Sequence, residues 1–304
     1  MLTEQNKIKL SELTEDVRFD EPMRAHTTFR VGGNAEAFVN ASSSMEIVAV
    51  RNYCAENEIP CICIGNGSNI LVGDEGIKGV VISIGSGMSE VQVVDNMIYA
   101  EAGALMSKVA AAALKAELSG FESLSGIPGS IGGAVFMNAG AYGGETKDCL
   151  ESAMVLTRNG VLKKYSNSDL KFSYRHSYIQ ETDEIVVSAT FKLKKGDKST
   201  ILDEMNYLNA LRQYKQPLEY PSCGSVFKRP TGHFVGPMII EAGLQGKQIG
   251  GAQVSMKHAG FIVNKGGATA TDYLNLIHYI QKTIKEKDDI DLHTEVRIIG
   301  EDKK

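Results

Sequence analysis

The feature that most constrains this chain is a glycine-rich stretch at residues 126–144, GIPGSIGGAVFMNAGAYGG, in which seven of nineteen residues are glycine. A second glycine-rich loop, GNGSN at 65–69, follows the apolar segment CICI at 61–64. Glycine adopts positive φ and lets a ligand or another backbone approach closely. The two loops therefore predict either tight turns between short strands or a pair of backbone-lined cradles for a ligand.

A phosphate group is a ligand that such loops suit, because successive bare peptide amides form concave sites for anions. Ser68, Asn69, Ser130 and Asn138 add side-chain donors to the two loops. The usual dinucleotide motif does not fit, since Ile70 stands where its third glycine belongs. The P-loop pattern and the GxSxG nucleophile elbow are also missing from the sequence. A nucleotide bound at these loops therefore implies another fold.

Composition narrows the class of protein. The 304 residues are 43% hydrophobic and 23% charged, as in an ordinary globular protein, and the net charge of −5 disfavours a nonspecific nucleic-acid binder. We see no secretory signal and no apolar segment of membrane-spanning length. The five cysteines are odd in number and form no CxxC, and the six histidines show no metal-ligand spacing. These patterns predict reduced thiols, a cytoplasmic location and no bound metal.

Helical and extended patterns alternate along the chain, with several hairpins, which favours an α+β fold over a doubly wound sheet. A capping box at Ser43 and Glu46 predicts a helix that stops before Pro60, and KKGDKS at 194–199 is the expected linker. Strands and hairpins are expected at 61–64, 78–84, 91–103, 153–166, 184–193 and 291–300, and further helices at 104–118, from about Leu202 to Pro217, and from Thr271 to Ile284.

Six segments, in this order, closely resemble the UDP-N-acetylenolpyruvoylglucosamine reductase family: HTTFRVGGNAEAF (26–38), PCICIGNGSNILV (60–72), the stretch 126–144, FSYRHS (172–177), CGSVFKRP (223–230) and TEVRIIG (294–300). The resemblance implies the flavin-binding fold shared with vanillyl-alcohol oxidase and p-cresol methylhydroxylase, in which FAD lies between two small α+β subdomains. We therefore expect an FAD-binding domain at 1–198, with subdomains at about 1–84 and 85–198, and an α+β substrate domain at 199–304.

The family reduces the enolpyruvyl ether of UDP-N-acetylglucosamine to UDP-N-acetylmuramate for peptidoglycan. The resemblance implies non-covalent FAD, NADPH as the hydride donor and a small nucleotide-sugar substrate. We also expect a monomer that binds neither nucleic acid nor membranes. One subgroup of the family has an extra loop with a tyrosine that covers the substrate. The short segment 194–199 leaves no room for that loop, so the chain resembles the shorter subgroup.

Three residues match the family's catalytic positions. Arg175 would stabilise negative charge on the substrate carboxylate or enolate, which suits its planar guanidinium. Ser225 would be the general acid that protonates the substrate carbon. Glu295 would either keep its proton when buried or orient Arg175. Taken without the resemblance, the same residues would be a surface arginine, a turn serine and a solvated strand glutamate.

The resemblance also assigns binding residues. The expected FAD contacts are Arg30, Gly65, Asn66, Gly67, Ser68, Asn69, Gly126, Pro128, Gly129, Ser130, Gly132, Gly133, Asn138, Gly140 and Ala141. Arg212, Lys215 and Lys228 are candidates for the substrate diphosphate or the enolpyruvate, with solvated charges as the alternative. Two other functions stay open at this point: another oxidase or dehydrogenase of the same flavin fold, and a noncatalytic flavin-binding regulator.

Overall fold

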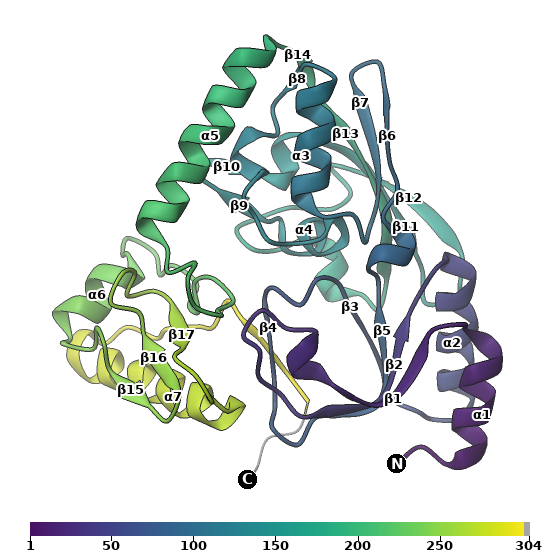
Figure 1. The fold of residues 1–304 in the computed structure, drawn as a ribbon, viewed down its shortest axis with the longest axis horizontal. Helices are drawn as coiled ribbons and strands as arrows, with labels where there is room; N and C mark the ends of the chain where they lie inside the picture. The colour runs from purple at the N-terminus through teal and green to yellow at the C-terminus, as the bar shows by residue number, and fades with distance from the viewer. Residues whose placement is uncertain (301–304) are drawn as a thin grey trace.

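The first part of the chain is built on a four-stranded sheet, and a computed structural model describes residues 1–300. The strands lie in the order β1 (Val17–Pro22), β2 (Asn34–Asn40), β5 (Ile77–Ser83) and β3 (Cys61–Ile64). The β1–β2 pair is antiparallel, whereas β5 pairs in parallel with both β2 and β3. Helices α1 (Glu4–Leu13) and α2 (Ser44–Glu56) lie beside this sheet at the lower right of Figure 1.

The second part is built on a five-stranded antiparallel sheet, at the top of Figure 1. Its strands lie in the order β12 (Leu162–Ser166), β11 (Leu150–Leu156), β13 (Ile185–Lys192), β7 (Met97–Glu101) and β6 (Val91–Val94). Helices α3 (Met106–Lys115) and α4 (Ile131–Met137) pack against it. One hydrophobic core runs through both parts, joining Ile47 and Val80 of the first to Ile98 and Phe191 of the second.

The C-terminal part, at the lower left of Figure 1, begins after the long helix α5 (Lys198–Lys215). It contains α6 (Val235–Glu241), β15 (Gln248–Ile249), β16 (Ala252–Val254), β17 (Ile262–Asn264), α7 (Ala270–Asp288) and β18 (Arg297–Ile299). Strand β18 leaves this part and pairs in parallel with β4 (Ile70–Val72) of the first part. The end of the chain therefore returns to the loop region that follows CICI.

Further contacts fasten the C-terminal part to the first part. The Asp74 carboxylate accepts hydrogen bonds from the amides of Ala270 and Thr271, both at 2.8 Å, at the N-terminus of α7. The rings of Phe29 and Tyr273 lie 4.4 Å apart between centroids and are fully buried. By contrast, α5 buries Ile201 in the core of the first two parts. The structure thus ties α5 to the second part of the molecule, through α3 and β8, and the residues beyond α5 to the first part.

The expected α+β class and most expected elements are confirmed, with four corrections. The segment 194–199 is not a free linker, because β14 (Lys194–Lys195) pairs with β8 (Leu118–Ser119) and Asp197 caps α5. The expected strand 291–300 is limited to β18. The helix expected at 104–118 covers only 106–115. At α2 the Ser43 hydroxyl accepts from the Glu46 amide, but the Glu46 carboxylate accepts from Ser42, so the capping box is incomplete.

The helices that the structure describes are too short or too polar to span a membrane. Within residues 1–300, no helix combines the length and the apolar character needed to cross a bilayer.

Replacing Asp74 with alanine tests how the C-terminal part is fastened. Asp74→Ala removes the carboxylate that satisfies two amides at the N-terminus of α7, together with its bond from the Thr271 hydroxyl. We expect the free energy of unfolding, measured with urea, to fall by about 2 kcal/mol. A change below about 0.5 kcal/mol, the usual effect of a surface substitution, would contradict this role.

Candidate active site

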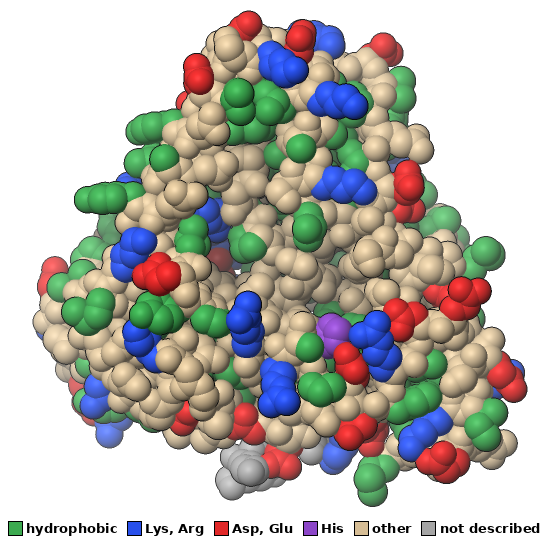
Figure 2. Space-filling view, in the orientation of Figure 1, with side chains coloured by type: hydrophobic (Ala, Val, Ile, Leu, Met, Phe, Trp, Pro, Cys, Tyr) green, Lys and Arg blue, Asp and Glu red, His purple; other side chains and the backbone are tan. Residues whose placement is uncertain are grey.

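A large cavity of about 1780 Å³ lies where the three parts of the molecule meet. Its wall includes residues of the first sheet's loops, of the second part and of the C-terminal part. Figure 2 shows the surface hollowed between the C-terminal part and the rest of the molecule. Sites for one drug-sized ligand usually measure about 300–1,000 Å³. This cavity therefore has room for a dinucleotide together with a second ligand.

The two glycine-rich loops lie side by side on the cavity wall. The Asn66 side-chain amide donates a 2.7 Å hydrogen bond to the carbonyl of Pro128, which joins them directly. A Cβ at Gly65 would collide with the Ser130 hydroxyl. Gly67 has φ +62°, and a Cβ there would collide with the carbonyl of His26. Glycine at position 65 lets the two loops approach each other, and glycine at position 67 lets the first loop pack against the backbone of His26.

The paired loops present unused hydrogen-bond donors. Among residues 1–300, no protein acceptor receives the backbone amides of residues 65–68, or those of Ser130 and Gly133. The Ser130 hydroxyl is buried and lacks a partner within the same residues. Buried donors without acceptors are rare in folded proteins and imply a partner outside the chain. The donor set fits an anionic ligand such as a diphosphate.

The strand β3 forms part of the same wall. Only Ile64 of CICI is buried, and Cys63 is exposed. The apolar run predicts a buried strand. The strand is confirmed, but its burial is wrong for residues 61–63, because the cavity lies against it and all four residues of β3 belong to the cavity wall. An apolar wall beside free amides suits a ligand with both a flat ring and a phosphate.

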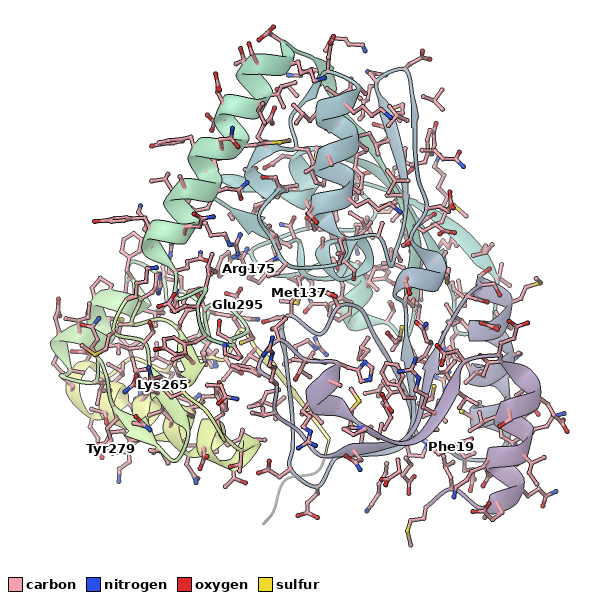
Figure 3. All side chains as sticks on the ribbon, viewed as in Figure 1. Phe19, Met137, Arg175, Lys265, Tyr279 and Glu295 are labelled. Atoms are coloured by element: carbon pink, nitrogen blue, oxygen red, sulfur yellow. The ribbon has the colours of Figure 1, made fainter. Side chains whose placement is uncertain are left out.

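Arg175 and Glu295 meet inside the cavity, from opposite sides, as Figure 3 shows. The Arg175 Nε donates a 2.6 Å hydrogen bond to Glu295 Oε1, and Nη2 donates a 3.1 Å bond to the carbonyl of Gly140. Their side chains are only 20% and 13% exposed. Of the five guanidinium N–H donors, two are thus used within residues 1–300, and the others remain for a ligand.

Ser225 lines the same cavity and is tied to Glu295 through the neighbouring residue. The Glu295 amide donates a 2.7 Å bond to the carbonyl of Val226, and Ser225 forms an isolated β-bridge with Phe261. The structure therefore brings together three residues that are 50 or more positions apart in the sequence. The cavity holds a fixed cation, a carboxylate and a hydroxyl beside the glycine loops.

Two cavity residues carried no signal in the sequence. His258 lines the cavity, and both its ring and the Ser225 hydroxyl lie within 4 Å of where a Cβ at Gly260 would stand. The Gly260 amide donates to His258 Nδ1, so Nε2 carries the proton, and burial lowers the pKa of His258, which keeps the ring neutral at pH 7. Arg297 stacks over Phe136 at 4.9 Å and also lines the cavity.

The other expected site residues divide into two groups. All of the expected FAD contacts line the cavity except Asn138, which is fully buried and bonds to neighbouring protein groups instead. Arg212 lines it too; its Nη1 has no partner among residues 1–300, and burial lowers its pKa. Lys215 is exposed, and neither Lys215 nor Lys228 belongs to the wall. A substrate role for these two lysines stays a prediction.

Comparisons with known proteins identify the domains of the chain. The family model "FAD binding domain" matches residues 35–166. The model "UDP-N-acetylenolpyruvoylglucosamine reductase, C-terminal domain" matches residues 216–299. A solved plant structure from Physcomitrella patens, BBE-like 1, is 15% identical with a TM-score of 0.50 over 62% of this chain and 44% of that one, which shows a shared fold alone. The two family models together show an FAD-binding domain followed by the C-terminal domain of the reductase family.

Several relatives match almost end to end. The UDP-N-acetylenolpyruvoylglucosamine reductase of Lactobacillus delbrueckii subsp. bulgaricus is 64% identical over 94% of this chain and 96% of its own length. The enzyme of the same name from Listeria innocua is 53% identical over the same shares. The crystal structure of the Thermus caldophilus reductase is 34% identical, with a TM-score of 0.79 over 93% of this chain and 98% of that one. This chain therefore belongs to the UDP-N-acetylenolpyruvoylglucosamine reductase family.

Proposed function

We propose that this chain uses FAD and NADPH to reduce UDP-N-acetylglucosamine enolpyruvate to UDP-N-acetylmuramate, a step of peptidoglycan synthesis. The observation that carries the proposal is the convergence of Arg175, Glu295 and Ser225 on the cavity that the two glycine loops also line. The names of the relatives, which match more than nine-tenths of the chain, support the same reaction.

The glycine loops would hold FAD through its diphosphate. The free amides of residues 65–68, with the buried Ser130 hydroxyl, offer several donors within one concave surface. The Cys61 to Ile64 wall would then face the flat rings of the cofactor. When bound, FAD relays a hydride from NADPH to the methylene carbon of the enolpyruvyl ether. The protein contributes binding, orientation and the handling of charge and proton.

Arg175 would bind the carboxylate of the substrate through the guanidinium donors that the protein leaves unused. Hydride addition places negative charge on the neighbouring carbon and its carboxylate, and preorganised donors at developing charge contribute a few kcal/mol each, roughly 3–4 at most. Glu295 fixes the guanidinium through Nε. The 2.6 Å hydrogen bond supports an orienting role for Glu295 over one as a neutral acid.

Ser225 would supply the proton, from its Oγ to the carbon next to the site of hydride addition. A serine hydroxyl is a weak acid, so it protonates only a strongly basic carbon. Ser225 belongs to the wall of the same cavity as Arg175, so one bound substrate can reach both side chains. The neutral imidazole of His258 and the Ser225 hydroxyl both lie near Gly260, within 4 Å of where a Cβ on that residue would stand.

The domain assignment also stays a proposal, with one change in its boundary. Because α5 buries Ile201 and Met205 in the core shared by the first two parts, we place the start of the substrate domain after Lys215 instead of at 199. The match of the C-terminal family model from residue 216 supports this boundary. A monomer and a cytoplasmic location remain predictions; the five unbridged cysteines support a reducing compartment.

The proposed reaction has a direct test. The purified yellow holoprotein is mixed anaerobically with NADPH, and flavin absorbance is followed before and after adding the enolpyruvyl nucleotide. We expect bleaching by NADPH and recovery of colour with the nucleotide. Recovery only with oxygen would indicate an oxidase, and a flavin that NADPH does not bleach would indicate a noncatalytic binder. Either outcome would reject the reductase.

Replacing Gly133 with alanine tests the cofactor cradle. Gly133 lies in α4 with ordinary φ, and the nearest protein atom to an added Cβ is the Ser130 hydroxyl at 3.6 Å, so the fold tolerates the methyl. We expect unchanged or slightly higher stability, by up to about 1 kcal/mol. We also expect FAD to dissociate at least about tenfold more readily, a loss of about 1.4 kcal/mol of binding.

The matched control for this prediction is Gly236→Ala. Gly236 also lies in a helix with no atom near an added Cβ, but on the C-terminal side of the cavity. It should leave FAD binding unchanged. Equal FAD affinity in both variants, measured by titrating the apoproteins, would show that the loop 126–144 does not contact the cofactor.

Ser225→Ala separates proton donation from cofactor binding. Reduction of the flavin by NADPH should continue at nearly the wild-type rate, because no proton from Ser225 is needed there. Reoxidation by the enolpyruvyl nucleotide should slow by about 10²-fold or more. Stopped-flow absorbance measures both rates. A similar loss in both half-reactions would mean that Ser225 shapes the flavin site instead of donating a proton.

A further inference from the structure

The backbone of Arg175 is held in an unfavourable conformation. Ser173 and His176 exchange two backbone hydrogen bonds, at 3.1 and 3.2 Å, which close a four-residue turn with Tyr174 and Arg175 at its corner. Arg175 has φ +53°, a left-handed conformation that residues with a Cβ adopt at an energetic cost. Such strain persists at functional sites only where the surroundings over-determine the backbone. The contacts of this turn show what holds it.

Two side-chain amides hold the two halves of the turn. Asn138 Nδ2 donates a 3.0 Å hydrogen bond to the carbonyl of Ser173. Gln180, in the short 3-10 helix Tyr178–Glu181, donates from Nε2 to the carbonyl of Arg175 at 3.1 Å. The same Nε2 also donates to the carbonyl of Phe136 at 2.8 Å, in the last turn of α4. The Arg175 backbone is thereby fastened to α4, which packs on the second sheet.

The orientation of the Gln180 amide follows from its neighbours. The groups that it meets are two carbonyl oxygens and the Met137 sulfur, which only accept, so the nitrogen must face them. Gln180 is not among the residues that line the cavity, so it reaches the ligands only through Arg175.

We propose that Gln180 is a positioning residue for Arg175, holding its backbone so that the guanidinium reaches Glu295 and the carboxylate of the substrate. This inference rests on the proposed function for its kinetic consequence. The structural consequence, a turn that opens when Gln180 is removed, does not depend on it. Loss of the amide leaves the carbonyl of Arg175 without its donor, so that Asn138 alone holds the turn from outside, at Ser173.

The test compares Gln180→Met and Gln180→Ala with a matched control. Methionine keeps the length and volume of the side chain but removes both donors. The control is Ser177→Ala, because the Ser177 hydroxyl donates to the same Phe136 carbonyl at 2.7 Å and, within residues 1–300, makes no hydrogen bond to the Arg175 turn. A merely structural loss at the end of α4 should thus affect all three variants alike.

The kinetic arm uses the holoprotein and anaerobic stopped flow. In the Gln180 variants we expect reoxidation of the flavin by the enolpyruvyl nucleotide to slow by about 10- to 100-fold. Reduction by NADPH should stay within about twofold, as should both rates in Ser177→Ala. In an Arg175→Ala background, Gln180→Met should cause no further loss, because the residue it positions is gone. Equal slowing of both half-reactions, or additive losses in the double variant, would overturn the inference.

A second arm does not depend on the reaction. Hydrogen exchange of the Ser173 and His176 amides reports whether the turn is closed, since both amides are bonded within it. Gln180→Met should speed their exchange by about tenfold or more, and Ser177→Ala should not. Unchanged exchange in Gln180→Met would overturn the inference, whatever the kinetics show. Failure of the wild-type protein to reduce the enolpyruvyl nucleotide would instead reject the proposed function and leave the exchange test valid.

Discussion

The ion pair between Arg175 and Glu295 is the interaction on which the site depends. Arg175 comes from the second part of the molecule and Glu295 from the last segment of the chain, just before β18. Among residues 1–300, neither side chain forms an ion pair with a second charged residue. Removing either one would leave the other charge partly buried and unpaired, which is costly. The pair therefore fixes where a guanidinium stands beside the cavity wall made by the glycine loops.

The position of Glu295 is set by contacts far from the pair itself. The side chain of Asn69, in the first glycine loop, donates to the carbonyl of Glu295, and the amide of Arg297 donates to the carbonyl of Asn69. The next residues continue the same alignment, because β18 pairs in parallel with β4. The loop expected to hold the cofactor and the strand that carries the carboxylate are thus one connected unit. The contacts that fasten the C-terminal part to the first part also help to fix the position of Glu295.

Much of the fold followed from local patterns. The hairpin at Asp95 and Asn96 and the helix after Ser43 are set by residues close in sequence, and both were expected. Predictions failed where distant contacts decide the outcome. Residues 194–195 pair with β8, and CICI faces the cavity, so neither a linker pattern nor an apolar pattern could identify these environments. Residues 291–296 have a strand-like sequence, but their backbone meets residues 226–228 only through single bonds and one isolated bridge, so no strand forms there.

The candidate site was accessible from the sequence in outline only. The resemblance placed Arg175, Ser225 and Glu295, and the density of glycine marked the two loops. The contacts that each of these residues makes in the folded chain could not be inferred from the sequence. Asn138 lies within the glycine stretch, yet it holds the turn of Arg175, because its left-handed backbone at the end of α4 directs its amide to Ser173. His258 and Arg297 belong to the cavity wall because the C-terminal part folds back onto the first part of the molecule.

The central claim is that Arg175, fixed by Glu295, receives the carboxylate in the cavity that also contains Ser225. A crystal structure of the holoprotein with UDP-N-acetylmuramate tests it most directly. The account predicts the lactyl carboxylate hydrogen-bonded to the Arg175 guanidinium, with the Ser225 Oγ as the hydroxyl nearest the carbon that gains the proton. A carboxylate bound instead at Lys215 or Lys228, with Arg175 facing away, would contradict it.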